Sequence, residues 1–100
     1  LPVVSNKNRR SVFMVGDSTV RNGRGDGRNG QWGWGDFVEG WLANPSVNIV
    51  NRAVCGLSSR TFITQGHWQR ALNMMKPGDI VLIQFGHNDA GELNDKSRAR

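Results

Sequence analysis

The sequence predicts an open α/β fold in which helices cover both faces of a parallel β-sheet. Three short apolar runs rich in β-branched residues alternate with two segments of helical periodicity. Continuous apolar runs of this kind are typical of strands buried on both faces. Each run ends in a turn that carries glycine and polar side chains. Such strand–helix–strand units pair in parallel with right-handed crossovers, so the three turns are expected at one edge of the sheet.

The first predicted strand runs from Ser11 to Gly16 and places Ser18 just beyond its carboxyl end. Residues 1–10 are polar and basic, and we expect them to form a flexible lead-in. Ser18 is a candidate nucleophile, because the strand ends of open parallel sheets border a crevice. The alternative is that Ser18 only caps the next helix. The neighbouring Asp17 is expected to bond the loop backbone rather than to act on a substrate.

A basic, glycine-rich loop from Val20 to Gln31 follows, and the next predicted helix covers Asp36 to Asn44. Four apolar side chains recur in this helix at a spacing that predicts one core-facing side: Phe37, Val38, Trp41 and Leu42. Trp32 and Trp34 lie among glycines. They suit either a tight structural turn or stacking against a pyranose ring.

The second predicted strand, Val47 to Val50, leads towards Gly56. Ser58 or Ser59 then opens a predicted helix from Thr61 to Met75. Its expected inward stripe consists of Trp68, Leu72 and Met75. The third predicted strand covers Asp79 to Phe85, and the polar tail from Gly91 to Arg100 is expected to be a loop.

Composition narrows the possible functions. The net charge of +5 and the sequence pI near 10.7 favour anionic partners such as acidic polysaccharide. We do not expect nucleic-acid binding, because no run of five basic residues occurs and the aromatic residues do not alternate with basic ones. The single cysteine excludes an intrachain disulfide, and the cysteine and histidines lack the spacing of metal ligands. No segment is long and apolar enough to predict a membrane span.

Three ordered sequence blocks resemble those of the SGNH (GDSL-type) hydrolases. They are Gly16-Asp17-Ser18, then Gly56, then Gly86-His87-Asn88-Asp89. The flanking segments are similar to the rhamnogalacturonan acetylesterase branch of that family: Val20-Arg21-Asn22, Trp32-Gly33-Trp34-Gly35-Asp36, Ser58-Ser59-Arg60-Thr61-Phe62 and Gln84-Phe85. The resemblance extends from about Val12 to about Gly91, so residues 1–100 are expected to be the N-terminal part of one hydrolase domain of flavodoxin-like α/β/α type.

The resemblance implies a serine esterase that needs no cofactor. Ser18 would be the nucleophile, and the backbone N–H groups of Ser18 and Gly56 with the side-chain amide of Asn88 would bind the oxyanion. Substrate contacts are expected from Arg60, Trp34 and His87. Leu57 stands where relatives often carry a basic residue, and Arg60, or Arg21 and Arg28, could replace it.

A general base is not evident in this sequence. His67 falls within a predicted helix, and the family position of His87 accompanies the oxyanion asparagine rather than serving as the base. The family's Asp-x-x-His belongs near the C-terminus of a longer chain and does not occur here. We therefore expect the base and its acid beyond Arg100.

Two classes of function stay open at this point. One is an esterase, acting on pectic acetate or on another ester such as xylan acetate or an acyl lipid. The other is a carbohydrate-binding module or an incomplete fragment with the same fold. The resemblance also implies an extracellular or periplasmic location. The remainder of the domain, or another chain, is expected beside the third strand.

Overall fold

The computed structural model describes residues 1–42 and 46–90. The tail expected as a loop from Gly91 to Arg100 lies outside the described residues, as does the end of the helix predicted to reach Asn44. Within the described ranges, no helix has the length and apolar character needed to cross a membrane.

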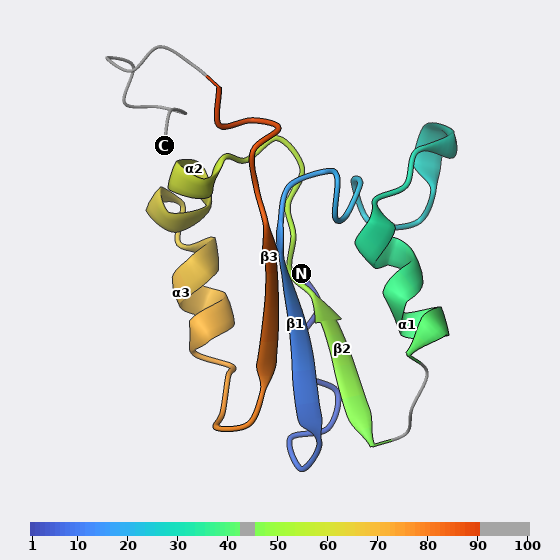
Figure 1. The fold of residues 1–100 in the computed structure, drawn as a ribbon, viewed down its shortest axis with the longest axis vertical. Coiled ribbons are helices and arrows are strands. Elements are labelled where there is room, and N and C mark those ends of the chain that lie inside the picture. Colours follow the sequence, from blue (N-terminus) through green and yellow to red (C-terminus); the bar gives the residue numbers. More distant parts are fainter. Residues whose placement is uncertain (43–45, 91–100) are drawn as a thin grey trace.

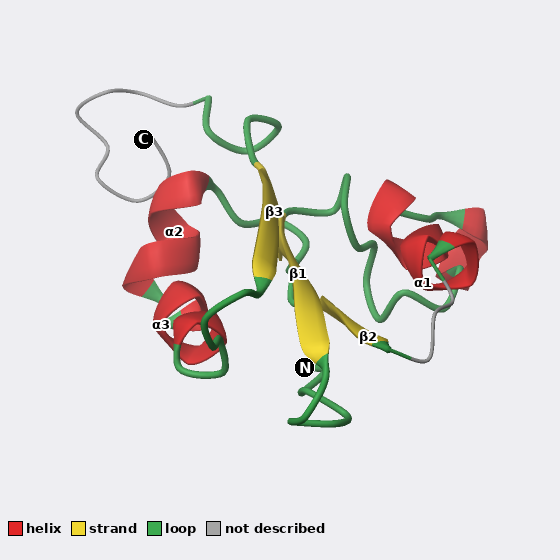
Figure 2. Ribbon diagram, turned by 60° about the horizontal axis from the view of Figure 1, so that its bottom comes forward, coloured by secondary structure: helices red, strands yellow, loops and turns green. Residues whose placement is uncertain are grey.

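Three parallel strands form the sheet, in the order β2–β1–β3 (Figure 1). Strand β1 covers Arg10–Gly16, β2 covers Val47–Asn51 and β3 covers Ile80–Gln84. Helix α1 (Val38–Trp41) lies on one side of the sheet, and α2 (Ser59–Thr64) and α3 (His67–Leu72) lie on the other (Figure 2). The three-layer parallel α/β arrangement predicted from the sequence is confirmed.

The core lies around β1, the central strand. Phe13 and Met14 are fully buried, and Val15 is 1% exposed. Towards α1, Met14 packs with Val20 and Ala53, against which Val38 and Ile49 also pack. Because β1 has a strand on each side, its carboxyl end is held in the middle of the sheet edge.

The predicted helix from Asp36 to Asn44 differs from the structure. The segment opens as a 3₁₀ turn over Trp34–Phe37 and becomes α-helical at Val38. Phe37 is 49%, Trp41 87% and Leu42 48% exposed, so their predicted core positions are wrong, whereas Val38 packs against the core. The tighter 3₁₀ turn changes the direction of Phe37, and its ring lies 5.0 Å from that of Trp32 instead of entering the core.

The predicted helix from Thr61 to Met75 is divided in two. Ser58 caps α2 by accepting a hydrogen bond from the N–H of Thr61, which confirms the predicted start. Gly66 then takes a left-handed conformation (φ 83°) that a helix interior does not allow, and α3 begins after it. Of the stripe expected to face inward, Leu72 is wrong, since it is 43% exposed, whereas Trp68 and Met75 are half-buried. Phe62 and Ala71 are the buried residues of the two helices.

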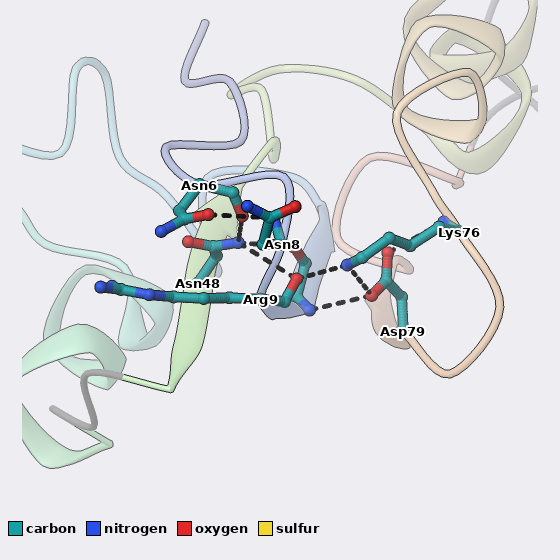
Figure 3. A network of polar contacts seen from close by, with 7 residues as sticks. Asn6, Asn8, Arg9, Asn48, Lys76 and Asp79 are labelled. Carbon is teal, nitrogen blue, oxygen red and sulfur yellow. Dashed lines mark hydrogen bonds and ion pairs between the residues drawn. The ribbon is translucent and has the colours of Figure 1, made fainter.

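Polar contacts connect the lead-in to the amino ends of the strands (Figure 3). Asn48, which is 3% exposed, donates to the carbonyl oxygen of Asn6, and Lys76 donates to that of Arg9. Asp79 accepts from the N–H of Ser11 at 2.9 Å, which joins β3 to β1. The flexibility expected for residues 1–10 stays a prediction, but this segment has specific attachments to the sheet.

Candidate active site

The turn after β1 is built around Asp17. This fully buried carboxylate accepts hydrogen bonds from the N–H of Thr19 at 2.9 Å and from its hydroxyl at 2.6 Å. The carbonyl of Asp17 accepts from the N–H groups of Val20 and Arg21. This is the turn chemistry expected of aspartate, and it confirms that Asp17 bonds the loop backbone. Ser18 is half-buried in this turn, directly after the central strand.

Gly16 allows this turn to lie close to β3. A Cβ atom at Gly16 would stand 2.4 Å from the carbonyl oxygen of Gln84 and 2.6 Å from a methyl of Val20. Both distances are too short for any side chain. The glycine before Asp17-Ser18 is therefore a packing requirement of the site.

The chain after β2 continues beside the end of β1. The N–H of Arg52 donates to the carbonyl of Met14 at 2.8 Å, and that of Val54 to the carbonyl of Gly16 at 3.0 Å. Val54 and Gly16 are thus paired, and Gly56 and Ser18 each follow two residues after this pair. Gly56 has φ 81°, and no atom lies within 4 Å of where its Cβ would be. A backbone N–H at such a residue can approach a substrate closely.

The turn after β3 is tied to the segment that follows Gly56. The side-chain amide of Asn88 donates to the carbonyl of Leu57 at 3.1 Å. The carboxylate of Asp89 accepts from both the N–H and the hydroxyl of Ser59. The structure therefore brings Ser18, Gly56 and Asn88 to three neighbouring turns at one edge of the sheet, seen at the top of Figure 1.

The other predicted site residues lie around these turns. Trp34 donates its backbone N–H to the carbonyl of Thr19 and its indole N–H to the side chain of Gln84, and it is 41% exposed. Arg60 is half-buried in the first turn of α2, and His87 is exposed beside Asn88. Their substrate contacts stay predictions.

Neither histidine is arranged as a base for Ser18. The ring of His67 packs 5.4 Å from that of Phe62, and the guanidinium of Arg70 lies 3.4 Å from its Nδ1. Burial lowers the pKa of His67, and the positive charges of Arg70, Arg52 and the N-terminus lower it further. In residues 1–42 and 46–90, neither His67 nor His87 hydrogen-bonds to Ser18.

In the described ranges, no three His, Cys, Asp or Glu side chains gather as a metal site. A cavity of about 180 Å³ lies beside the basic loop, where Arg21, Arg24 and Asp36 line it. Arg21 also donates to the carbonyl of Arg24 at 3.1 Å. Arg21 is one of the three arginines expected to replace the basic residue that relatives carry at the position of Leu57. It is the one of the three that lines this cavity.

Sequence reasoning missed the pairing of Asp89 with Ser59 and the contact of Gln84 with Trp34. The Asn-Asp dipeptide indicated only a turn, because the partner of Asp89 lies 30 residues earlier in the chain. Gln84 ends an otherwise apolar strand. That isolated polar side chain was the available signal.

Comparison with known proteins decides the family. The family model for the GDSL-like lipase/acylhydrolase family matches residues 14–100. The chain belongs to this family. The resemblance inferred from the three sequence blocks is confirmed.

Similar GDSL-like proteins include two curated relatives. A probable rhamnogalacturonan acetylesterase, YesY of Bacillus subtilis, is 41% identical over 81% of this chain and 36% of its own length. A rhamnogalacturonan acetylesterase of Emericella nidulans is 36% identical over 89% of this chain and 33% of its own. The chain therefore spans about a third of the length of these relatives.

A solved structure supports the fold. The crystal structure of YxiM from Bacillus subtilis superimposes with a TM-score of 0.70 at 30% identity, covering 82% of this chain and 23% of that one. This GDSL-like chain thus shares the flavodoxin-like α/β architecture with a protein of which it represents less than a quarter.

Proposed function

We propose that this chain is the N-terminal part of a serine acetylesterase that releases acetate from a rhamnogalacturonan-like pectic polysaccharide. The observation that carries the proposal is the convergence of Ser18, Gly56 and Asn88 at three adjacent strand ends of a GDSL-like domain. Two relatives named as rhamnogalacturonan acetylesterases support the substrate class.

In the proposed reaction, the hydroxyl oxygen of Ser18 attacks the acetyl carbonyl while a base takes its proton. Negative charge develops on the carbonyl oxygen. The N–H groups of Ser18 and Gly56 and the amide of Asn88 are proposed to donate to it. Collapse of the intermediate expels the sugar alkoxide, which receives the proton from the base. Water then hydrolyses the acetyl-serine and releases acetate without a cofactor.

We place the general base and its partner acid beyond Arg100. The packing of His67 against Phe62 and Arg70 favours this placement, as does the share of about a third that the chain represents of its relatives. A serine hydroxyl without a base is a weak nucleophile at neutral pH. Activity is therefore assigned to the complete polypeptide.

The net charge of +5 suits an acidic polysaccharide. Arg60, His87 and Trp34 surround the three turns and are proposed to contact the sugar chain. A polymer of this kind does not cross a bilayer, so the proposed location is extracellular or periplasmic.

Measurement of acetate release by the complete polypeptide from acetylated rhamnogalacturonan tests the function. Ser18→Ala is expected to abolish release and to leave the melting temperature unchanged. Thr64→Ala, which removes an exposed hydroxyl on α2, is the matched control and should retain full activity. If Ser18→Ala keeps a tenth of the wild-type turnover, Ser18 is a cap and the proposal is wrong.

Two further arms refine the assignment. Asn88→Ala is expected to lower kcat about 10²–10³-fold with a much smaller change in KM, because an oxyanion donor acts mainly in the transition state. A normal kcat with a raised KM would assign Asn88 to ground-state binding. Equal or faster release from acetylated xylan would reject the pectic substrate while retaining the esterase.

A further inference from the structure

We propose that Asp89 is a positioning residue that orients Asn88. It holds the turn after β3 against the segment after β2, and thereby sets the direction of the Asn88 amide relative to Gly56. The inference rests on the proposed function of this site.

The contacts of Asp89 carry the argument. One carboxylate oxygen accepts from the N–H of Ser59 at 2.8 Å, and the other accepts from the Ser59 hydroxyl. A carboxylate bonded through both oxygens to one residue is constrained in rotation as well as in distance. Asp89 therefore forms a two-point attachment between segments 30 residues apart.

Asn88 lies next to this attachment. Its amide nitrogen donates to the carbonyl of Leu57, two residues before Ser59 and directly after Gly56. Adjacent side chains of the β3 turn thus bond adjacent parts of the segment that carries Gly56. The direction of the Asn88 amide therefore depends on the segment 57–59, to which Asp89 is also hydrogen-bonded.

Besides these side-chain bonds, the turn has a backbone bond and an aromatic contact at its start. Its backbone is closed by a bond of 3.2 Å from the N–H of Asp89 to the carbonyl of Gly86, and both Gly86 and His87 are exposed. The ring of Phe85 packs 5.3 Å from that of Phe62 and fixes only the start of the turn. Without Asp89, the turn would lose its two-point attachment to Ser59 and keep the Asn88–Leu57 bond. A displacement near 1 Å of the Asn88 amide would cost much of an orientation-dependent rate.

Steady-state kinetics of the complete polypeptide on an aryl acetate test the inference. Asp89→Ala is expected to lower kcat by about tenfold or more and to change KM less than about threefold, because a misdirected oxyanion donor acts in the transition state. Asp26→Ala removes an exposed aspartate whose one bond stays within its own loop, and it should retain wild-type kcat.

The deciding measurement repeats the substitution in an Asn88→Ala background. Because Asp89 acts through Asn88, Asp89→Ala should lower kcat no further there than about twofold. A general loss of structure would lower kcat by the same factor in both backgrounds. That result, or a normal kcat for Asp89→Ala alone, overturns the proposal.

Two milder variants decide the matter if Asp89→Ala does not fold. Asp89→Asn keeps one acceptor for the Ser59 N–H and should stay within about threefold of wild type, and Ser59→Ala should lose about threefold because only one of two bonds is removed. Both losses should vanish in the Asn88→Ala background, and losses that persist there overturn the proposal. Thr64→Ala is the control for Ser59→Ala on the same helix.

The proposed function can fail separately. If Ser18→Ala is inactive and Asn88→Ala impaired while Asp89→Ala is normal, the esterase stands and the positioning role is wrong. If wild type releases no acetate, or Ser18→Ala remains active, both are wrong.

Discussion

Strands β1 and β3 have nearly the same character in sequence but opposite environments in the structure. Each contains four consecutive apolar residues, 12–15 in β1 and 80–83 in β3. In β1 none of the four is more than 9% exposed, whereas in β3 Ile80 is 48% and Ile83 61% exposed. Strand β1 has a neighbouring strand on both sides, and β3 on one. An edge position alone does not expose a strand, because β2 also has one neighbour and its Val50 is 1% exposed. An apolar run therefore predicts that a strand is stabilised by burial, but the neighbouring strands and helices determine whether the strand is buried.

The cover over β3 is also incomplete on the side of α2 and α3. A cavity of about 200 Å³ lies there, lined by Val15, Phe62, Trp68 and Ile83 among others. The relatives, of which this chain spans only about a third, supply a candidate for the missing cover. We propose that chain beyond Arg100 lies beside β3.

The largest expected effect concerns residues 1–100 expressed alone. The open edge of β3 should pair with other copies, because unpaired apolar strand edges promote association. Light scattering should show oligomers or aggregates without esterase activity. Ile83→Lys should reduce this association, and Leu42→Lys, at an exposed position (48%) at the end of α1 on the other side of the sheet, should not. A cooperatively melting, active monomer would contradict both the proposed cover and the placement of the base.

Core substitutions in the complete polypeptide sharpen the comparison. Phe13→Ala should lower the free energy of unfolding by about 3–5 kcal/mol, because it leaves a cavity around a fully buried ring. Ile83→Ala should cost about 2–5 kcal/mol if later chain covers β3. A loss of about 0.5 kcal/mol or less, as at exposed sites, would show that β3 stays open. Chemical denaturation measures both.

Gly16→Ala tests the close contact between the ends of the two strands. Its methyl would meet the carbonyl of Gln84, so one strand end must move. We expect a loss of about 1–3 kcal/mol, typical of overpacking. Because Ser18 follows two residues later, kcat should fall as well. Unchanged stability and kcat would show that the turn adapts without moving Ser18.

The smallest effect lies at the amino ends, where Asp79 joins β3 to β1 (Figure 3). Burial raises the pKa of Asp79, but hydrogen bonds from the side chain of Lys76 and from the N–H groups of Ser11 and Lys76 lower it more, so the net pKa lies below the ordinary value. The stabilisation is complete above the unfolded-state pKa and is lost as pH falls through the folded-state pKa.

Thermal melting as a function of pH measures this contribution. Wild type should lose stability as pH falls from the ordinary aspartate pKa towards the lower one. Asp79→Asn should be less stable at neutral pH and should lack this part of the acid dependence. If the stability of wild type and of Asp79→Asn changed equally with pH, ionised Asp79 would be ruled out as the link between the strands.

The sequence by itself determined the sheet and the location of the site. Alternation of apolar runs and polar turns is a local property, so the three strands were predicted within a residue or two. Parallel pairing follows from the strand–helix–strand order of the elements, and it places Ser18, Gly56 and Asn88 at one edge. The capping of α2 by Ser58 was also predictable, because the partner lies three residues away.

Tertiary structure alone decided the features that depend on distant or competing contacts. The exposure of Phe37 and Trp41 follows from a 3₁₀ turn that periodicity does not reveal, and the division of the second helix follows from the left-handed Gly66. The bond between Asp89 and Ser59 joins segments 30 residues apart. Both apolar runs predicted burial, which β1 has and β3 largely lacks. The exposure of β3 was not readable, because burial depends on neighbouring elements and a sequence pattern describes only the residue itself.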